Sequence, residues 1–112
     1  LDFATDRKLY LSGENIWFRA LVSVRNAHGA KQLSNVLYLE LYQNKHALVK
    51  KKFQIVDGKV EGMLAIPEEI HTANYYLRAY TQYQRNFPPE SFFTTLLTII
   101  NPEIPIRKSK TR

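Results

Sequence analysis

Hydrophobic and polar residues alternate with a period of two along most of this chain, and this period constrains the fold more than any other feature. Successive side chains of a β-strand point to opposite faces, so an alternating run predicts a strand with one buried face. Residues 15–25 are the clearest case, because every second residue is apolar: Ile16, Phe18, Ala20, Val22 and Val24. No stretch keeps a helical period of 3.6 residues, so the sequence predicts an all-β protein.

Alternating or β-rich runs recur at short intervals and predict seven strands. In two of them, residues 35–43 and 74–83, the inward residues are Leu37, Leu39 and Leu41 in the first and Tyr75, Leu77 and Ala79 in the second. The expected strands lie at residues 2–4, 15–25, 35–43, 47–56, 59–66, 74–83 and 91–100. Seven short strands separated by turns predict a seven-stranded antiparallel β-sandwich of immunoglobulin or fibronectin-III-like type.

Turn residues between these runs mark positions with a structural role. Asp57 and Gly58 connect two alternating runs, and because both positions tolerate a positive φ, they predict a two-residue β-hairpin. Gly13 is the expected positive-φ residue of a tight turn. Tyr75 begins its strand just after a turn and faces inward, as the tyrosine-corner residue of such sandwiches does when its hydroxyl bonds to the preceding loop. A further turn is expected at residues 26–29.

The chain has 112 residues and no cysteine. That length suits one domain with a core that needs no disulfide or zinc. We expect a sandwich domain at residues 1–102 and a basic linker or disordered tail at residues 103–112. The segment at residues 101–112 contains two prolines and no periodicity. The tail contributes half of the net charge of +6, so a nucleic-acid or membrane-binding arm is the other interpretation. A start at Leu1 instead of Met indicates a piece of a longer protein.

Membrane insertion is not expected from this sequence. No apolar run approaches the roughly 20 residues that a membrane-spanning helix needs. No positively charged start leads into an apolar signal core either.

Three segments resemble a known family. Residues 5–20 read TDRKLYLSGENIWFRA and are similar to the opening of the second macroglobulin-type domain of alpha-2-macroglobulin-like proteins. Residues 34–41, SNVLYLEL, and 75–87, YYLRAYTQYQRNF, resemble the version of that domain in large cell-envelope proteins of Gram-negative bacteria. Ser12 departs from the proline of the family pattern, and residues 71–74 replace its Ser-Gly turn.

This resemblance spans residues 3–102 and implies a sandwich module within a long extracytoplasmic protein of the periplasm or outer membrane. In that family such a module acts as a spacer, a scaffold or a docking surface. The thioester of full-length macroglobulins needs a cysteine, which this chain lacks, and belongs to a different domain.

Residue types used in catalysis are present, but not in catalytic arrangements. His28, His46 and His71 all fall in turns or at strand ends, and none has a second ligand at metal-site spacing. Neither a Gly-x-Ser-x-Gly motif nor a glycine-rich phosphate loop occurs. Glu40 and Arg78 are better explained as a cross-strand pair than as a catalytic pair. We therefore expect no enzyme, no cofactor and no metal.

Residues 50–52 are three consecutive lysines within an expected strand. Lysines on a strand commonly protect a sheet edge from pairing with another chain, so this strand is predicted to lie at an edge. A polyanion site is the other interpretation. A groove that follows a phosphate backbone would need more basic residues than one strand supplies, so no nucleic-acid partner is expected.

Aromatic and basic residues gather on the outward positions. Trp, Tyr and Arg are enriched in interface hot spots, and a large exposed patch of them indicates a partner. The predicted interaction surface consists of Trp17, Arg19, Arg78, Tyr80, Tyr83, Arg85 and Phe87, with Tyr76 among the same outward positions. Two interpretations stay open for Trp17 and Phe87, which either join this surface or fold under the loop at residues 84–90 to complete the core.

These features predict a non-catalytic structural or interaction module. It would dock through one continuous surface to adjacent domains of the same chain or to a cell-envelope protein. The alternative is a carbohydrate-binding or adhesive module, in which exposed, coplanar Trp or Tyr rings flanked by carboxylate or amide groups stack on sugar rings.

Overall fold

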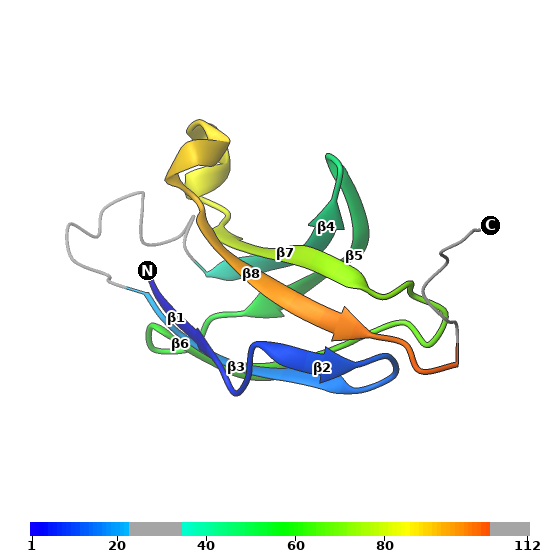
Figure 1. Cartoon of the computed structure of the whole chain (residues 1–112). Coiled ribbons are helices and arrows are strands. Elements are labelled where there is room, and N and C mark those ends of the chain that lie inside the picture. The colour runs from blue at the N-terminus through cyan, green and yellow to red at the C-terminus, as the bar shows by residue number, and fades with distance from the viewer. Residues whose placement is uncertain (23–34, 104–112) are drawn as a thin grey trace.

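The computed structural model describes residues 1–22 and 35–103. This part of the chain holds eight β-strands and two short 3-10 turns (Figure 1). In chain order these are β1 (Asp2–Thr5), β2 (Leu9–Leu11), β3 (Asn15–Leu21), β4 (Val36–Gln43), β5 (His46–Gln54), β6 (Lys59–Ala65), β7 (Ala73–Thr81), η1 (Gln84–Asn86), η2 (Pro89–Ser91) and β8 (Phe93–Ile100). The expected turn at residues 26–29 and all but the first residue of the expected tail lie outside the described residues.

The strands form two sheets that pack face to face as a sandwich, as the alternation predicted. One sheet has three strands in the order β1-β3-β6, and the other has five in the order β2-β8-β7-β4-β5. Figure 1 shows β1, β3 and β6 as the lower layer, with β7 and β8 crossing above them.

The prediction of seven antiparallel strands was wrong in two respects. The described residues contain an eighth strand, β2, and it pairs in parallel with β8, so that Leu9 lies opposite Thr98 and Leu11 opposite Ile100. Three residues are too few for alternation to be recognised in a sequence. The parallel pairing arises because the chain leaves β1 in one sheet and joins the edge of the other sheet before it returns to β3.

The core lies between the two sheets and consists of the inward residues of both. The three leucines of β4 and every second residue of β3 are buried, as are Tyr75, Leu77 and Ala79 of β7 and Leu97 and Ile99 of β8. Each leucine buried in this way contributes about 1.5–3 kcal/mol relative to an exposed one. The predicted inward faces are therefore confirmed, apart from Val22, which is only partly buried, and Val24, which lies outside the described residues.

The connection at Asp57 and Gly58 is a tight turn, but the two strands it joins do not form a hairpin. Both residues have positive φ, 53° and 74°, as predicted. Pairing is limited to one isolated bridge between Val56 and Lys59, and then β5 and β6 diverge into different sheets. The two-residue hairpin of this protein is instead the β4–β5 pair, which turns at Asn44 and Lys45 with φ of 53° and 67°.

Two other structural predictions are confirmed, one by the backbone of Gly13 and one by the side chain of Tyr75. Gly13 has φ of 82°, the left-handed region that favours glycine. Tyr75 is buried and its hydroxyl donates a hydrogen bond of 2.5 Å to the carbonyl oxygen of His71, as a tyrosine corner requires. Burial raises the pKa of Tyr75 above its usual value.

The lysine-rich strand lies at a sheet edge, as predicted. β5 is the last strand of the five-stranded sheet and pairs only with β4 among the described strands. Lys50 and Lys52 lie opposite Glu40 and Tyr38 in that pairing. Lys51 points the other way, and its ammonium lies 5.4 Å from the centre of the Phe53 ring.

Candidate interaction surface

The predicted interaction surface is divided between two opposite sides of the sandwich. Trp17 and Arg19 are exposed on the outward face of β3, in the three-stranded sheet. Arg78 and Tyr80 lie on the outward face of β7, in the five-stranded sheet. The outward faces of two packed sheets point in opposite directions, so the expectation of one continuous surface was wrong. Spacing along a strand identifies a face, but it does not tell which sheet the strand joins.

Tyr80 is less accessible than its outward position predicted. The side chain is only 6% exposed, because its ring is stacked between two other rings. Tyr38 lies 5.3 Å away on one side and Phe92 lies 4.3 Å away on the other, measured between ring centres. Tyr80 is therefore a buried support of this face and not one of its contact residues.

Arg78, two residues before Tyr80 on β7, extends this stack. Its guanidinium carbon lies 4.6 Å from the centre of the Tyr42 ring and 5.6 Å from that of Phe92. Tyr42 in turn packs against Tyr76 at 5.7 Å, since these two residues are directly opposite in the β4–β7 pairing. About three quarters of the Arg78 side chain is buried by these contacts, which fixes the position of its charge.

Arg85 completes the row at its other end. Its guanidinium carbon lies 4.8 Å from the centre of the Tyr38 ring, and Nη1 donates a hydrogen bond of 2.9 Å to the hydroxyl of the same tyrosine. These rings and guanidinium groups lie in one row, which we call the aromatic–arginine ladder: Tyr76, Tyr42, Arg78, Phe92, Tyr80, Tyr38 and Arg85. Each cation–ring contact of this kind is worth roughly 0.5–1 kcal/mol where it is exposed.

Glu40 lies beneath the ladder and joins several of its members. Its side chain is 4% exposed even though it points outward from β4. Arg78 donates to Oε1 from Nη2 at 2.9 Å and from Nε at 3.2 Å, and the Tyr80 hydroxyl donates to Oε2 at 2.6 Å. Lys50 Nζ adds an ion pair at 3.5 Å. The predicted cross-strand pairing of Glu40 with Arg78 is confirmed.

The protonation states of this cluster follow from those contacts. Burial alone would raise the pKa of Glu40, but the hydrogen bonds from Tyr80 and Arg78 and the nearby positive charges hold that pKa below its usual value. Burial, and then the hydrogen bond to the carboxylate, raises the pKa of Tyr80. Glu40 is therefore ionised and Tyr80 neutral at pH 7. A carboxylate with these partners holds the ladder in place and is not available as a general base.

Tyr83 and Phe87 form an exposed pair at the edge of the ladder. Their rings meet edge to face at 5.2 Å, and Phe87 is 44% exposed, so it does not fold into the core. The turn that carries them is fixed at its start, because Thr81 N donates to Gln84 Oε1 at 3.0 Å and Gln84 N donates back to Thr81 Oγ1 at 3.1 Å.

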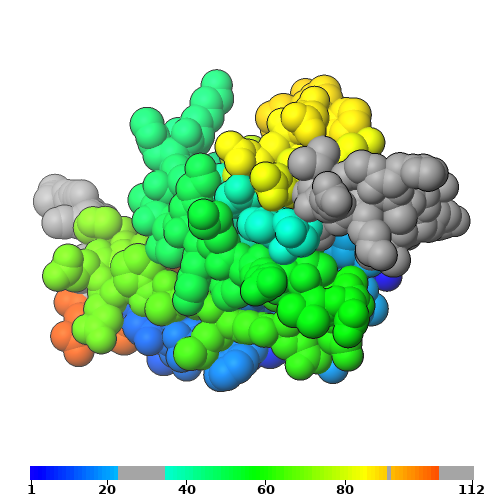
Figure 2. All heavy atoms as spheres, turned by 180° about the vertical axis from the view of Figure 1, so that it is seen from behind, coloured from blue at the N-terminus to red at the C-terminus, as the bar shows by residue number. Residues whose placement is uncertain are grey.

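Two parts of the chain project from the molecule. In Figure 2, the turn between β4 and β5 (green) and the loop that follows β7 (yellow) project beyond the rest of the protein, with a recess between them. Figure 1 shows β7 running between the same two projections.

The outward face of the five-stranded sheet also has an apolar end, which sequence reasoning missed. Four large apolar side chains, between 36% and 53% exposed, lie there on the neighbouring strands β2 and β8: Leu9, Leu11, Leu96 and Ile100. Leu96 lies opposite the exposed Tyr76, so this apolar end is continuous with the ladder. The run at residues 91–100 is apolar on both faces, so alternation could not identify its outward residues, and β2 was not recognised as a strand.

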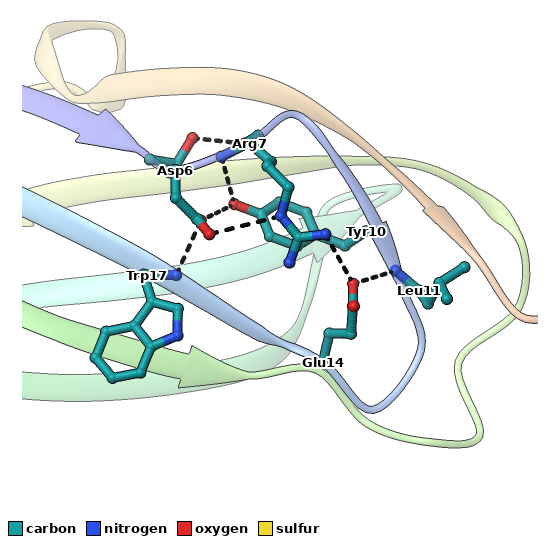
Figure 3. Close-up of polar contacts among 7 residues, drawn as sticks. Asp6, Arg7, Tyr10, Leu11, Glu14 and Trp17 are labelled. Carbon is teal, nitrogen blue, oxygen red and sulfur yellow. Dashed lines mark hydrogen bonds and ion pairs between the residues drawn. The ribbon is translucent and has the colours of Figure 1, made fainter.

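On the other side of the sandwich, Asp6 links the first three strands (Figure 3). Its Oδ1 accepts a hydrogen bond of 2.6 Å from the Tyr10 hydroxyl and one of 3.2 Å from Trp17 N, and Asp6 N donates to Trp17 O at 3.0 Å. Arg7 reaches Glu14 Oε1 at 3.2 Å, and that oxygen also accepts from Leu11 N at 2.8 Å.

These bonds shift two pKa values in opposite directions. Burial, and then the hydrogen bond to Asp6, raises the pKa of Tyr10 to about 12. Burial acts to raise the pKa of Asp6 as well, but the hydrogen bonds from Tyr10 and Trp17 outweigh it and lower that pKa. The network therefore consists of an ionised carboxylate and a neutral phenol at pH 7, and it connects the segment that follows β1 to β2 and β3.

Residues 1–22 and 35–103 contain no group of three or more His, Cys, Asp or Glu side chains placed to hold a metal ion. No helix in the same part of the chain is long and apolar enough to cross a membrane. Comparison with known proteins returned no matching family model and no similar curated protein.

Proposed function

We propose that this chain is a non-catalytic interaction module of macroglobulin type, with an immunoglobulin-like sandwich, in a larger extracytoplasmic protein of the cell envelope. It docks to a neighbouring domain or to a protein partner through the outward face of its five-stranded sheet. The resemblance of residues 5–20, 34–41 and 75–87 supports the family. The hydrogen bond from Tyr75 to the loop before it supports the immunoglobulin-like type.

The observation that carries the docking proposal is the composition of one exposed face. Exposed apolar side chains on β2, β7 and β8 adjoin a row of stacked tyrosines and arginines whose positions are fixed. Soluble monomers rarely expose large apolar patches, and Tyr and Arg are the residues that contribute most to interface hot spots. Because the ladder is already ordered, a partner would not have to immobilise these side chains, which lowers the entropic cost of binding.

The charges on this face favour a partner that presents carboxylates. Lys50, Lys52, Arg78 and Arg85 lie on or beside the ladder, and Glu40 is the acidic residue among them. The resulting excess of positive charge would speed the encounter with an acidic surface and fix its orientation.

Hydroxyl-radical footprinting tests the docking proposal. The labelling of Leu96, Tyr76 and Phe87 is measured by mass spectrometry in the isolated chain and in the cell-envelope fraction that contains the natural protein. We expect these side chains to be labelled several-fold less in the envelope, while Val56, an exposed residue at the turn after β5, is labelled equally in both. Equal labelling of all four residues would show that nothing covers this face.

A further inference from the structure

A shallow hollow lies on the outward face of the three-stranded sheet, on the side opposite the aromatic–arginine ladder. Ala4, Arg19 and Glu61 lie side by side across β1, β3 and β6 and form one wall. Trp17, two residues before Arg19, forms the other wall. The hollow has a volume of about 640 Å³, and we call it the Trp17 hollow.

The floor between these walls is backbone. Thr5, Phe18 and Gly62 are aligned across the same three strands, one position along from Ala4, Arg19 and Glu61. By the alternation of a strand, side chains at these positions turn toward the core, and Gly62 has none. A flat molecule can therefore approach the sheet closely between the two walls.

The indole of Trp17 lines this hollow, and the backbone that carries it is fixed. Trp17 O accepts a hydrogen bond of 3.0 Å from Asp6 N, and Trp17 N donates one of 3.2 Å to Asp6 Oδ1. Figure 3 shows the indole pointing away from Asp6 and Tyr10, on the outer side of β3. Trp17 remains 53% exposed, so its ring is accessible to a ligand.

The opposite wall carries a hydrogen-bond donor and an acceptor side by side. Arg19 Nε donates to Glu61 Oε2 at 3.0 Å, and about 60% of each side chain is exposed. Among the described residues this is the one polar contact of Arg19, so its terminal nitrogens can still donate to a ligand. The second carboxylate oxygen of Glu61 can likewise accept a hydrogen bond.

We propose that the Trp17 hollow binds one pyranose ring of a glycan. A pyranose ring has C–H groups on its flat faces and hydroxyl groups around its rim. Its face would lie against the indole, and two neighbouring hydroxyls, each a donor and an acceptor, would bond to Arg19 and Glu61. An apolar protein side chain fits less well, since it would offer no hydrogen bond to the remaining guanidinium nitrogens and the second carboxylate oxygen of that wall. The site is independent of the docking face proposed above, because the two lie on opposite sheets.

The intrinsic fluorescence of the protein reports on this site directly, because Trp17 is the only tryptophan in the chain. Hexasaccharides of glucose, of N-acetylglucosamine and of galacturonic acid are titrated into the wild-type protein up to about 50 mM. A single-ring site of this shallow kind should saturate with a Kd of roughly 0.1–10 mM for at least one of them. That ligand should shift the Trp17 emission.

Variants separate this site from other causes of a fluorescence change. Arg19→Ala should weaken binding about tenfold, the expected loss of one hydrogen bond to a charged group, while the indole remains as reporter. Glu61→Gln should weaken binding by less, because glutamine keeps a neutral acceptor oxygen. Arg85→Ala, on the opposite sheet, should bind as the wild type does.

Three outcomes would overturn the proposal. The first is the absence of saturable binding by any of the three hexasaccharides. The second is binding that is unchanged in both Arg19→Ala and Glu61→Gln. The third is a wild-type protein that dimerises in light scattering while Trp17→Ala stays monomeric, because the hollow would then be a contact between two copies of the chain. None of these outcomes alters the footprinting of Leu96, Tyr76 and Phe87, so the two proposals fail separately.

Discussion

Replacing Glu40 with glutamine should destabilise the protein, even though Glu40 lies on an outward face. The carboxylate accepts hydrogen bonds from Arg78 and Tyr80 and forms an ion pair with Lys50. Glutamine has a similar shape, but it lacks the charge and retains one acceptor oxygen. At most one of the two main donors then keeps its bond, and that bond is weaker because the acceptor is neutral.

The expected magnitude follows from these contacts. A hydrogen bond to a charged group contributes about 1.5–3 kcal/mol, and the Arg78 bond belongs at the lower end because that side chain is partly exposed. We expect Glu40→Gln to lower the free energy of unfolding by about 2 kcal/mol, and Tyr80→Phe by about 1.5 kcal/mol. Because the two side chains interact directly, the double variant should lose about 1 kcal/mol less than the sum of the single losses.

Urea denaturation at pH 7, followed by the fluorescence of Trp17, measures the free energy of unfolding of the wild type, the two single variants and the double variant. Glu69→Gln removes one exposed carboxylate elsewhere and serves as the control for net charge. It should change the stability by less than about 0.5 kcal/mol. Losses from Glu40→Gln and Tyr80→Phe that simply add would show that Tyr80 and Glu40 do not interact as the structure describes.

The difference in stability between the wild type and Glu40→Gln should depend on pH in a defined direction. The pKa of Glu40 in the folded protein lies below its ordinary value of 4.5. A group of this kind contributes its stabilisation in full above the unfolded pKa and loses it as the pH falls through the folded pKa. The stability difference between wild type and Glu40→Gln should therefore be constant from pH 7 to about 5.5 and become smaller below about pH 4. A difference that grows on acidification would contradict this assignment.

Three further substitutions test other parts of the fold by thermal or urea denaturation. Gly62→Ala would place its Cβ 3.0 Å from a ring carbon of Phe53, and overpacking of this kind should cost about 1–3 kcal/mol; an unchanged midpoint would mean that the ring moves freely. Tyr75→Phe removes the hydroxyl that bonds to His71 and should cost about 1 kcal/mol, whereas no loss would argue against a tyrosine corner. Gly13→Ala forces a side chain to adopt φ of 82° and should cost about 1 kcal/mol, and equal or higher stability would contradict that backbone conformation.

The interaction surface was only partly predictable from sequence. The outward positions of Trp17 and Arg78 followed from alternation, but their separation onto opposite sides depends on sheet membership, which alternation does not encode. The burial of Tyr80 depends on Phe92, which lies just before β8, beyond the loop that follows β7. The exposure of Leu96 depends on which face of a strand with apolar residues on both faces meets the core.

Local chemistry along the chain was enough to determine the class of fold and several turns. Alternation placed Leu37, Leu39 and Leu41 in the core, because successive side chains of a strand point to opposite faces. Positive φ at Gly13 and Gly58 followed from the freedom of glycine at tight turns. These properties depend on a residue and its near neighbours, so they can be read from sequence.

Tertiary structure alone decided which strands became neighbours. The turn at Asp57 and Gly58 formed as its residues required, yet the strands on either side joined different sheets, because burying both inward faces mattered more than continuing one hairpin. The parallel pairing of β2, the ladder over Glu40 and the Trp17 hollow all arise from contacts between residues far apart in the chain. Such contacts depend on the relative placement of whole strands, and no local pattern in the sequence specifies that placement.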